Sequence, residues 1–176
     1  MINNDNINPF SLTGKTVLVT GASSGIGKAV AVMCSKMGAT VIATGRNLER
    51  LNGTLSEMEG PNNVIFPADL TIEEDISRLV DFCPQLDGVA HCAGISTRNL
   101  LKSVRKKDID KVMEANFNAP VLLQRALLKA KKVNKNASIV FIASRAPFAP
   151  AIGNGIYAAS KGALIAYAKV LGYRSK

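Results

Sequence analysis

A short apolar run followed by three glycines, between residues 16 and 27, restricts the fold of this chain more than any other feature. The run Thr16–Thr20 is rich in β-branched residues, long enough for one buried parallel strand and too short for a helix. Gly21, Gly25 and Gly27 follow it, and glycine permits both a tight turn and the close approach of another backbone. We therefore expect a buried strand that leads into a glycine-rich turn.

Helical spacing begins within this turn, which places the turn at the start of a helix. The apolar positions of that spacing are Ile26, Val30, Met33 and Met37. A strand, a glycine turn and a helix start in this order set a phosphate against free backbone N–H groups at the positive end of the helix dipole. Ser23 and Ser24 add hydroxyl donors there. An ordinary strand-to-helix turn is the alternative, but the flanking elements favour a nucleotide-binding turn.

The length and composition of the chain indicate one globular unit. Its 176 residues, 47% of them hydrophobic, suffice for one domain with a sizeable core. We expect residues 1–11 to form an N-terminal extension and residues 12–176 to form a single domain. No uninterrupted apolar run reaches the length that spans a membrane, so no membrane partner is expected. Met1–Phe10 is rich in asparagine and lacks a basic region followed by an apolar stretch, so no secretory signal peptide is expected.

The cysteine and histidine content predicts neither disulfides nor a metal site. Cys34, Cys83 and Cys92 are odd in number and have no paired spacing, which favours reduced thiols in a cytoplasmic protein. His91 is the single histidine, and no set of metal ligands accompanies it in the sequence. We expect it to be buried and hydrogen-bonded in a structural role.

The charge is distributed unevenly along the chain. Residues 1–114 hold 12 basic and 13 acidic side chains, whereas residues 115–176 hold ten basic ones and no acid, giving a net charge of +9. A docking face for an acidic partner is one interpretation; the one that we favour is a chain that stops before its balancing acids. For the run Lys129, Lys131, Lys132 and Lys135 a solvated helix end is favoured. No aromatic residues interleave this run, so no nucleic-acid partner is expected.

Strand and helix signals alternate along the rest of the chain. Further strands are predicted at Thr40–Thr44, Val64–Phe66, Leu86–His91 and Ser138–Ala143. The first predicted helix stops at Gly38, the second runs from an Asn47 cap to about Met58, and the third follows a Thr71 cap. A fourth helical segment is predicted over Val104–Val133, with a break near Asn118-Ala119-Pro120, and a last helix begins near Asn154. This alternation predicts an α/β fold with a doubly wound parallel, Rossmann-like sheet.

Tyr157 and Lys161 carry the clearest signal of acid–base chemistry. They lie four residues apart, on one face of the last predicted helix. A fixed cation beside a tyrosine stabilises the phenolate and makes the hydroxyl usable as an acid near neutral pH. On its own this spacing is more typical of an ordinary amphipathic helix. Ser144 at the end of the fifth strand and Asn116 in the preceding helix supply the context that favours a catalytic site.

Taken together, these motifs resemble the short-chain dehydrogenase/reductase family, from Leu12 to the end of the chain. The residues that carry the resemblance are Thr20-Gly21-x-x-x-Gly25-Ile26-Gly27 with Asn116, Ser144, Tyr157 and Lys161. The resemblance implies strand order 3-2-1-4-5 and a ligand crevice between the first and fourth strands, where that order reverses. It also implies an NAD(P)-dependent oxidoreductase that interconverts a ketone and a secondary alcohol, with the hydride coming from the cofactor.

The resemblance assigns a role to each of four catalytic residues. Tyr157 would donate the proton to the carbonyl, and Ser144 would hydrogen-bond the substrate oxygen. Lys161 would bind the nicotinamide ribose and favour the phenolate of Tyr157. Asn116 would hold a water that links Lys161 to solvent.

The resemblance also implies a set of cofactor-binding residues: Gly21, Ser23, Ser24, Gly25, Ile26, Gly27, Arg46, Asp69, Leu70, Cys92, Ala93, Gly94, Tyr157 and Lys161. Asp69 would meet the adenine amino group, with a turn or cap role as the alternative. Arg46 follows the second strand, and glycine stands where NAD-preferring enzymes carry an acid, which predicts NADP(H) in preference to NAD(H). His91 and Cys92 replace two asparagines of the family pattern. We expect this segment still to form one wall of the cofactor site, because Gly94 and the backbone at the strand end make much of the contact.

Within the family, the segment from Ile95 to Leu101 and the helix after it look most like 3-oxoacyl-[acyl-carrier-protein] reductases and their broad-specificity relatives. Many sugar, steroid and polyol dehydrogenases share this segment and are the alternative. A small-molecule or acyl-thioester carbonyl substrate and a homo-oligomer are therefore expected. Family members continue past the Tyr-x-x-x-Lys helix with a sixth strand, a substrate lid and a seventh strand, which this sequence lacks. A truncated, catalytically weak dinucleotide-binding fragment is the alternative function, and for a chain that truly ends at Lys176 we expect aggregation or weak binding without turnover.

Overall fold

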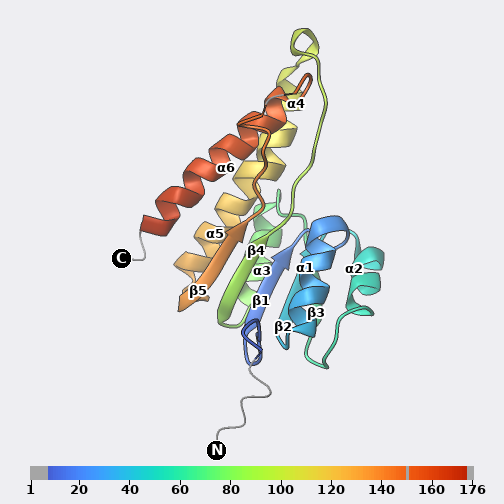
Figure 1. Ribbon diagram of the computed structural model, residues 1–176, viewed down its shortest axis with the longest axis vertical. Coiled ribbons are helices and arrows are strands. Elements are labelled where there is room, and N and C mark those ends of the chain that lie inside the picture. The colour runs from blue at the N-terminus through green and yellow to red at the C-terminus, as the bar shows by residue number, and fades with distance from the viewer. Residues whose placement is uncertain (1–7, 150, 174–176) are drawn as a thin grey trace, which may run out of the picture.

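A five-stranded sheet with helices on both faces forms the described part of the chain, residues 8–149 and 151–173, in this computed structural model (Figure 1). The strands are β1 (Thr16–Thr20), β2 (Thr40–Gly45), β3 (Val64–Pro67), β4 (Leu86–His91) and β5 (Val133–Phe141). The helices are α1 (Gly25–Lys36), α2 (Leu48–Leu55), α3 (Glu73–Phe82), α4 (Lys106–Met113), α5 (Ala119–Lys129) and α6 (Gly155–Tyr173). All strand pairs are parallel and their order is β3-β2-β1-β4-β5, which confirms the predicted doubly wound sheet.

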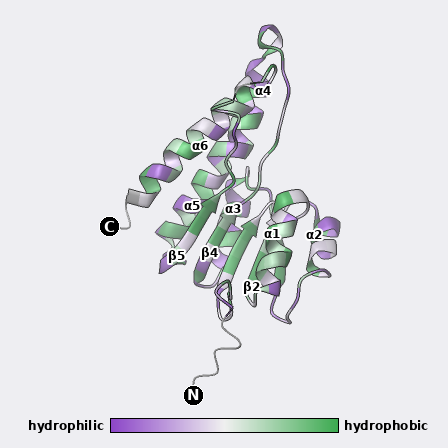
Figure 2. Ribbon diagram, in the orientation of Figure 1, coloured by the Kyte–Doolittle hydropathy of each residue, from purple (hydrophilic) through white to green (hydrophobic). Residues whose placement is uncertain are grey.

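The strands supply alternate side chains to two separate hydrophobic layers, because successive residues of a strand point to opposite faces. On one face Leu18 and Ile42 pack with Leu79 of α3 and Leu123 of α5. On the other face Val17, Val19, Val41 and Ala43 pack with Ala31 of α1 and Leu51 of α2. Figure 2 shows the apolar colour running along the strands between these helix layers. The sheet is therefore the centre of the core, and its carboxyl edge is free to build a site.

Helix α1 buries a different face from the one that the sequence spacing predicts. Ile26 and Met33 are exposed, with relative accessibilities of 59% and 56%. The buried positions are Gly27, Ala31 and Ser35, which are spaced four residues apart. These side chains are small, so the helix axis lies close to the strands and the larger residues turn outward.

Two helix boundaries also differ from the sequence predictions. Helix α2 begins after Asn47, whose Oδ1 accepts the Arg50 N–H at 2.8 Å as expected, but the helix ends at Leu55 rather than near Met58. Helix α3 begins at Glu73 with Ile72 at the N-cap, so Thr71 does not cap it. The Thr71 hydroxyl instead donates to Asp69, because that carboxylate lies two residues before it.

Helices α4 and α5 are joined by a π-helical segment, Glu114–Asn118, instead of being broken at Pro120. Pro120 lies in the first turn of α5, directly after the π-helical segment. The extra residue of a π-turn rotates the side chains that follow it, and such turns often mark functional sites. The segment contains Asn116, one of the predicted catalytic residues.

Strand β5 is longer at its start than predicted, because it begins at Val133 rather than at Ser138. Its pairing with β4 is interrupted by a register shift between Leu86 and Gly88, after which Ser138 pairs with Gly88. The strand ends at Phe141, so Ser144 lies three residues beyond it, in the loop before α6.

Candidate active site

The glycine turn between β1 and α1 packs directly against the segment that follows β4. Gly21 has a φ of 65°, and a Cβ at this position would lie 2.8 Å from the backbone N and Cα of Ala93. A Cβ at Gly27 would overlap the carbonyl of Gly21. These two glycines therefore let three backbone segments meet at the point where the strand order reverses.

Gly25 meets a different requirement, because it faces open space. Its φ is 55°, and a Cβ there would have no atom within 4 Å. The neighbouring residues Ser24 and Ile26 are exposed, and the Ser24 side chain caps no backbone N–H of α1. The first turn of α1 thus presents its N–H groups to an open space beside the crevice, an arrangement that fits a dinucleotide pyrophosphate.

Thr20 joins the two halves of this crevice, a role that the sequence did not reveal. Its Oγ1 accepts the backbone N–H groups of Cys92 and Ala93, both at 3.1 Å, although 72 and 73 residues separate the partners. Thr20 is 1% exposed. The only sequence signal was its place directly before the first glycine of the motif. Its hydroxyl fixes the backbone after β4 against the end of β1.

Asn116 holds the next part of the same segment. Its Oδ1 accepts the Ile95 N–H at 2.7 Å, and its Nδ2 donates to the Ile95 carbonyl at 2.9 Å and to the Ser160 hydroxyl at 3.0 Å. Asn116 is completely buried. The side-chain amide therefore clamps the loop after β4 to helix α6.

Ser160 is a second residue that the sequence reasoning missed. It lies inside the Tyr-Ala-Ala-Ser-Lys motif, is fully buried, and donates its hydroxyl to the Tyr157 carbonyl at 2.8 Å. It accepts the Asn116 amide with the same oxygen. Ser160 therefore connects the Asn116 side chain to the backbone in the first turns of α6 by hydrogen bonds.

Lys161 is buried at the centre of the crevice, with 5% of its surface exposed. Its Nζ donates to the Ile142 carbonyl at 2.7 Å, just beyond the end of β5. Burial lowers the pKa of Lys161, because the charged ammonium loses its hydration. Burial also raises the pKa of Cys92 to about 11, so this thiol is protonated at neutral pH.

Gly94 lies against both Asn116 and Lys161. A Cβ at Gly94 would be 3.1 Å from Asn116 Oδ1 and 3.5 Å from Lys161 Nζ. The structure thus brings Asn116, Lys161 and the Cys92-Ala93-Gly94 segment into one cluster.

Tyr157 and Ser144 lie beside this cluster, on separate segments. Tyr157 is half-buried on α6, and Lys161 Nζ lies 6.0 Å from the centroid of its ring. Ser144 is half-buried in the loop before α6, where its Oγ accepts the Ala146 N–H at 3.1 Å. Between these two described residues there is no hydrogen bond.

Arg46, Asp69 and Leu70 lie at the carboxyl ends of β2 and β3. The Arg46 Nη1 is 3.9 Å from Asp69 Oδ2. Leu70 is 7% exposed and belongs to the core cluster beneath the sheet, so only its backbone is available to a ligand.

His91 is buried and hydrogen-bonded, as its sequence context predicts. One ring nitrogen lies 3.0 Å from Gln124 Oε1, and the ring stacks on Phe141 with centroids 4.5 Å apart. Burial lowers the pKa of His91 to about 4. The residue is therefore a neutral link between β4 and α5.

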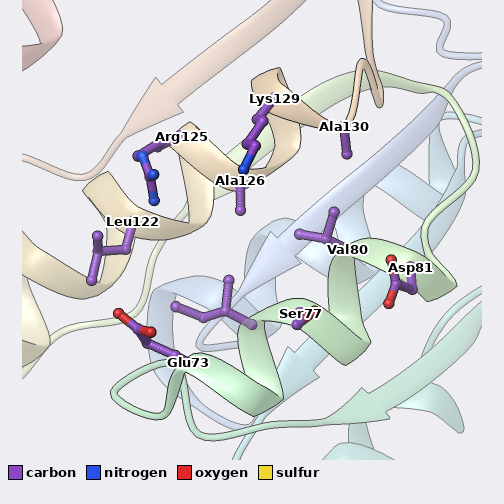
Figure 3. Close-up of a pocket in the computed structure, with 10 residues that line it drawn as sticks. Glu73, Ser77, Val80, Asp81, Leu122, Arg125, Ala126, Lys129 and Ala130 are labelled. Atoms are coloured by element: carbon purple, nitrogen blue, oxygen red, sulfur yellow. The ribbon is translucent and has the colours of Figure 1, made fainter.

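A cavity of about 460 Å³ lies away from this cluster, in a groove between α3 and α5 (Figure 3). Acidic side chains of α3, Glu73 and Asp81, line one wall, and basic side chains of α5, Arg125 and Lys129, line the other. None of the predicted catalytic or cofactor residues contributes to it. Within residues 8–149 and 151–173, we find no cluster of metal-ligating side chains and no helix long and apolar enough to cross a membrane.

The sequence matches the model of the short chain dehydrogenase family over residues 15–175. The chain belongs to the short-chain dehydrogenase family. It is 37% identical over 164 residues to a 3-oxoacyl-[acyl-carrier-protein] reductase of Rickettsia felis, an alignment that covers 93% of this chain and 68% of that protein. It is 29% identical over 174 residues to the 3-ketodihydrosphingosine reductase of Bos taurus, covering 93% of this chain and 52% of that protein.

Solved structures of the short-chain dehydrogenase family have the same fold. A short chain dehydrogenase from Escherichia coli CFT073, solved with NADPH, superimposes with a TM-score of 0.84 at 33% identity, covering 93% of this chain and 72% of that one. An oxidoreductase from E. coli superimposes with a TM-score of 0.86 at 33% identity, covering 96% and 73%. Membership makes this chain an oxidoreductase of the family, and the predicted fold and family are confirmed.

Proposed function

We propose that this short-chain dehydrogenase interconverts a ketone and a secondary alcohol with NADP(H), and that Tyr157 is the proton donor to the carbonyl. The observation that carries the proposal is the position of the buried Lys161. Its Nζ donates a hydrogen bond to the Ile142 carbonyl oxygen at 2.7 Å, and it lies four residues after Tyr157 on α6. A cation fixed by burial and by a backbone carbonyl cannot swing away from its neighbours. We propose that it stabilises the negative charge that develops on the Tyr157 oxygen as its proton moves to the carbonyl.

The other polar residues keep this pair in position. Asn116 fixes the loop after β4 through Ile95, and Ser160 ties that amide to the Tyr157 carbonyl. Ser144, oriented by the Ala146 N–H, is proposed to donate its hydroxyl to the substrate oxygen. Such fixed positions matter because displacements of about 1 Å cost about a hundredfold in rate.

The nucleotide is proposed to lie across the carboxyl edge of β1 and β4. The glycine turn and the first turn of α1 would hold its pyrophosphate, with Ser23, Ser24 and Ile26 beside it, and the Cys92-Ala93-Gly94 segment would form the wall of the crevice. Asp69 and the backbone of Leu70 would lie near the adenine, and Lys161 near the nicotinamide ribose. When bound, the nicotinamide supplies the hydride of the reaction.

The substrate is proposed to be a 3-oxoacyl thioester or a related small carbonyl compound. Support comes from the names of the relatives, since several that are 35–37% identical are 3-oxoacyl-[acyl-carrier-protein] reductases. The chain spans 68% of their length, so the part of those proteins beyond the match has no counterpart in these residues.

Replacing Tyr157 by phenylalanine tests the catalytic assignment. We expect Tyr157→Phe to abolish reduction of a 3-oxoacyl thioester while NADPH affinity changes by no more than a few-fold, because only the acidic hydroxyl is lost. Stopped-flow absorbance at the NADPH band measures turnover, and fluorescence titration measures binding. Turnover near the wild-type rate would remove Tyr157 as the acid. Tight NADPH binding with no turnover by the wild-type chain itself would favour the alternative, a catalytically weak dinucleotide-binding module.

Replacing Arg46 by alanine tests the cofactor preference. A guanidinium can meet a ribose 2′-phosphate with paired, charged hydrogen bonds, which NADH cannot use. We expect the wild-type chain to bind NADPH more tightly than NADH, and Arg46→Ala to reduce the ratio of the two affinities by about tenfold or more, since hydrogen bonds to charged groups contribute about 1.5–3 kcal/mol. Equal affinities in the wild type, or an unchanged ratio in the variant, would contradict the preference.

A further inference from the structure

Arg46, the residue that we propose binds the ribose 2′-phosphate of NADPH, faces a carboxylate in this structure. Its Nη1 lies 3.9 Å from Oδ2 of Asp69, across the ends of two neighbouring strands. The Arg46 side chain is 71% exposed and that of Asp69 is 31% exposed. The two residues that the sequence assigns to opposite ends of the adenosine are thus close enough to attract each other.

The carboxylate is held in place by hydrogen bonds, whereas the guanidinium is largely exposed to solvent. Asp69 Oδ1 accepts the Thr71 N–H at 3.0 Å and the Thr71 hydroxyl at 2.8 Å. The Asp69 N–H donates to Oδ2 of Asp75 at 2.8 Å. These bonds leave Oδ2 of Asp69 directed at Arg46, and fix it there.

The neighbouring basic residue is occupied and cannot take the place of Arg46. Arg78 donates to Oδ1 of Asp75 at 3.0 Å, and its guanidinium lies 5.7 Å from the centroid of the Phe66 ring. Asp75 is therefore neutralised within its own helix, and Asp69 is left with Arg46 as its cationic neighbour.

We propose that Asp69 is a specificity-determining residue that competes with the ribose 2′-phosphate for the Arg46 guanidinium, an inference that rests on the proposed NADP(H) preference. NADPH must draw Arg46 away from a fixed carboxylate before its phosphate is fully paired. NADH has no such phosphate and leaves the ion pair intact. Asp69 therefore reduces the difference between the NADPH and NADH affinities, so the preference for NADPH is smaller than Arg46 alone would give.

The test is the ratio of NADPH to NADH affinity, measured by calorimetric titration of the full chain at low ionic strength. Four proteins are compared: the wild type, Asp69→Asn, Arg46→Ala and the double variant. Asparagine keeps an oxygen that can accept both Thr71 bonds, so the turn is preserved. Any change in adenine binding affects both cofactors equally and cancels in the ratio. Asp110→Asn is the matched control, because Asp110 forms an exposed ion pair with Lys106 on α4.

We expect Asp69→Asn to raise the ratio by about 1.5- to fivefold, the range of an exposed ion pair, and Asp110→Asn to leave it unchanged. In the Arg46→Ala background, Asp69→Asn should no longer change the ratio, because the residue acts through Arg46. An unchanged ratio in Asp69→Asn, with Arg46→Ala still lowering it, overturns this inference alone. An equal rise in both backgrounds also overturns it, since Asp69 would then repel the phosphate directly. If Arg46→Ala changes the ratio in neither background, both the inference and the proposed preference fail.

Discussion

The hydroxyl of Thr20 is a single group on which the geometry of the nucleotide crevice depends. It accepts two partly buried backbone N–H groups, those of Cys92 and Ala93, and so connects β1 to the segment after β4. We expect Thr20→Val to lower the free energy of unfolding by about 1–3 kcal/mol. Valine keeps the shape but leaves the Ala93 N–H without its acceptor, and the Cys92 N–H keeps only the Ala90 carbonyl, at 3.1 Å. NADPH binding should weaken as well. Chemical denaturation and fluorescence titration measure the two effects.

Thr20→Ser is the matched control at the residue scale, because serine keeps the acceptor and loses only a methyl group. It should retain nearly all of the NADPH affinity. If Thr20→Val and Thr20→Ser weaken NADPH binding equally, the methyl group and not the hydroxyl is responsible.

At the scale of the elements, His91 and Gln124 link strand β4 to helix α5 through a buried hydrogen bond. Burial lowers the pKa of His91 to about 4, from the ordinary 6.5. Between these values the unfolded chain takes up a proton that the folded chain does not, so stability falls as the pH is lowered from 6.5 to 4. The loss over this window should be about 3 kcal/mol. Urea unfolding of the wild type and of His91→Asn at several pH values measures it.

The variant isolates this one group, because every carboxylate titrates in both proteins. Asparagine cannot take up the proton, so the wild type should lose more stability than His91→Asn as the solution is acidified below pH 6.5. Parallel stability curves for the two proteins would mean that protonation of His91 does not oppose folding.

At the scale of the whole molecule, the described surface carries apolar side chains that favour association. Leu101, Phe148 and Ile152 are 82%, 76% and 88% exposed, and Val140 on β5 is 51% exposed. Within the described sheet β5 pairs with β4 alone, so its other edge is open to another strand. We expect the chain to self-associate with rising concentration, and Val140→Lys to reduce that association. Light scattering after size-exclusion chromatography measures it.

Val170→Lys is the control for this edge, because it removes an equally apolar exposed residue (66%) from helix α6. It should reduce association less than Val140→Lys does. Equal effects of the two substitutions would show that general surface hydrophobicity, rather than the open strand edge, causes the association. A homo-oligomer built on the other exposed apolar residues would persist in both variants.

Much of the fold follows from local patterns that the sequence displays directly. The strands β1 and β4 have the predicted bounds, Asn47 caps α2, and Gly38, with a φ of 92°, follows the end of α1. These features depend on residues within a few positions of one another: β-branched runs, a side-chain cap and a glycine that adopts a positive φ. The clustering of Lys161, Asn116 and Gly94 was also predictable, although only through the family motifs.

The tertiary structure alone decided the features that depend on distant partners. Sequence spacing favoured Met33 as a buried residue of α1, but the close approach of this helix to β1 buries Ala31 and Ser35 instead. The roles of Thr20 and Ser160, and the pairing of Arg46 with Asp69, join residues 72, 44 and 23 positions apart in the chain. A side-chain hydroxyl or charge has no periodicity to reveal its partner. Its role is fixed only when the sheet brings the ends of its strands to one edge.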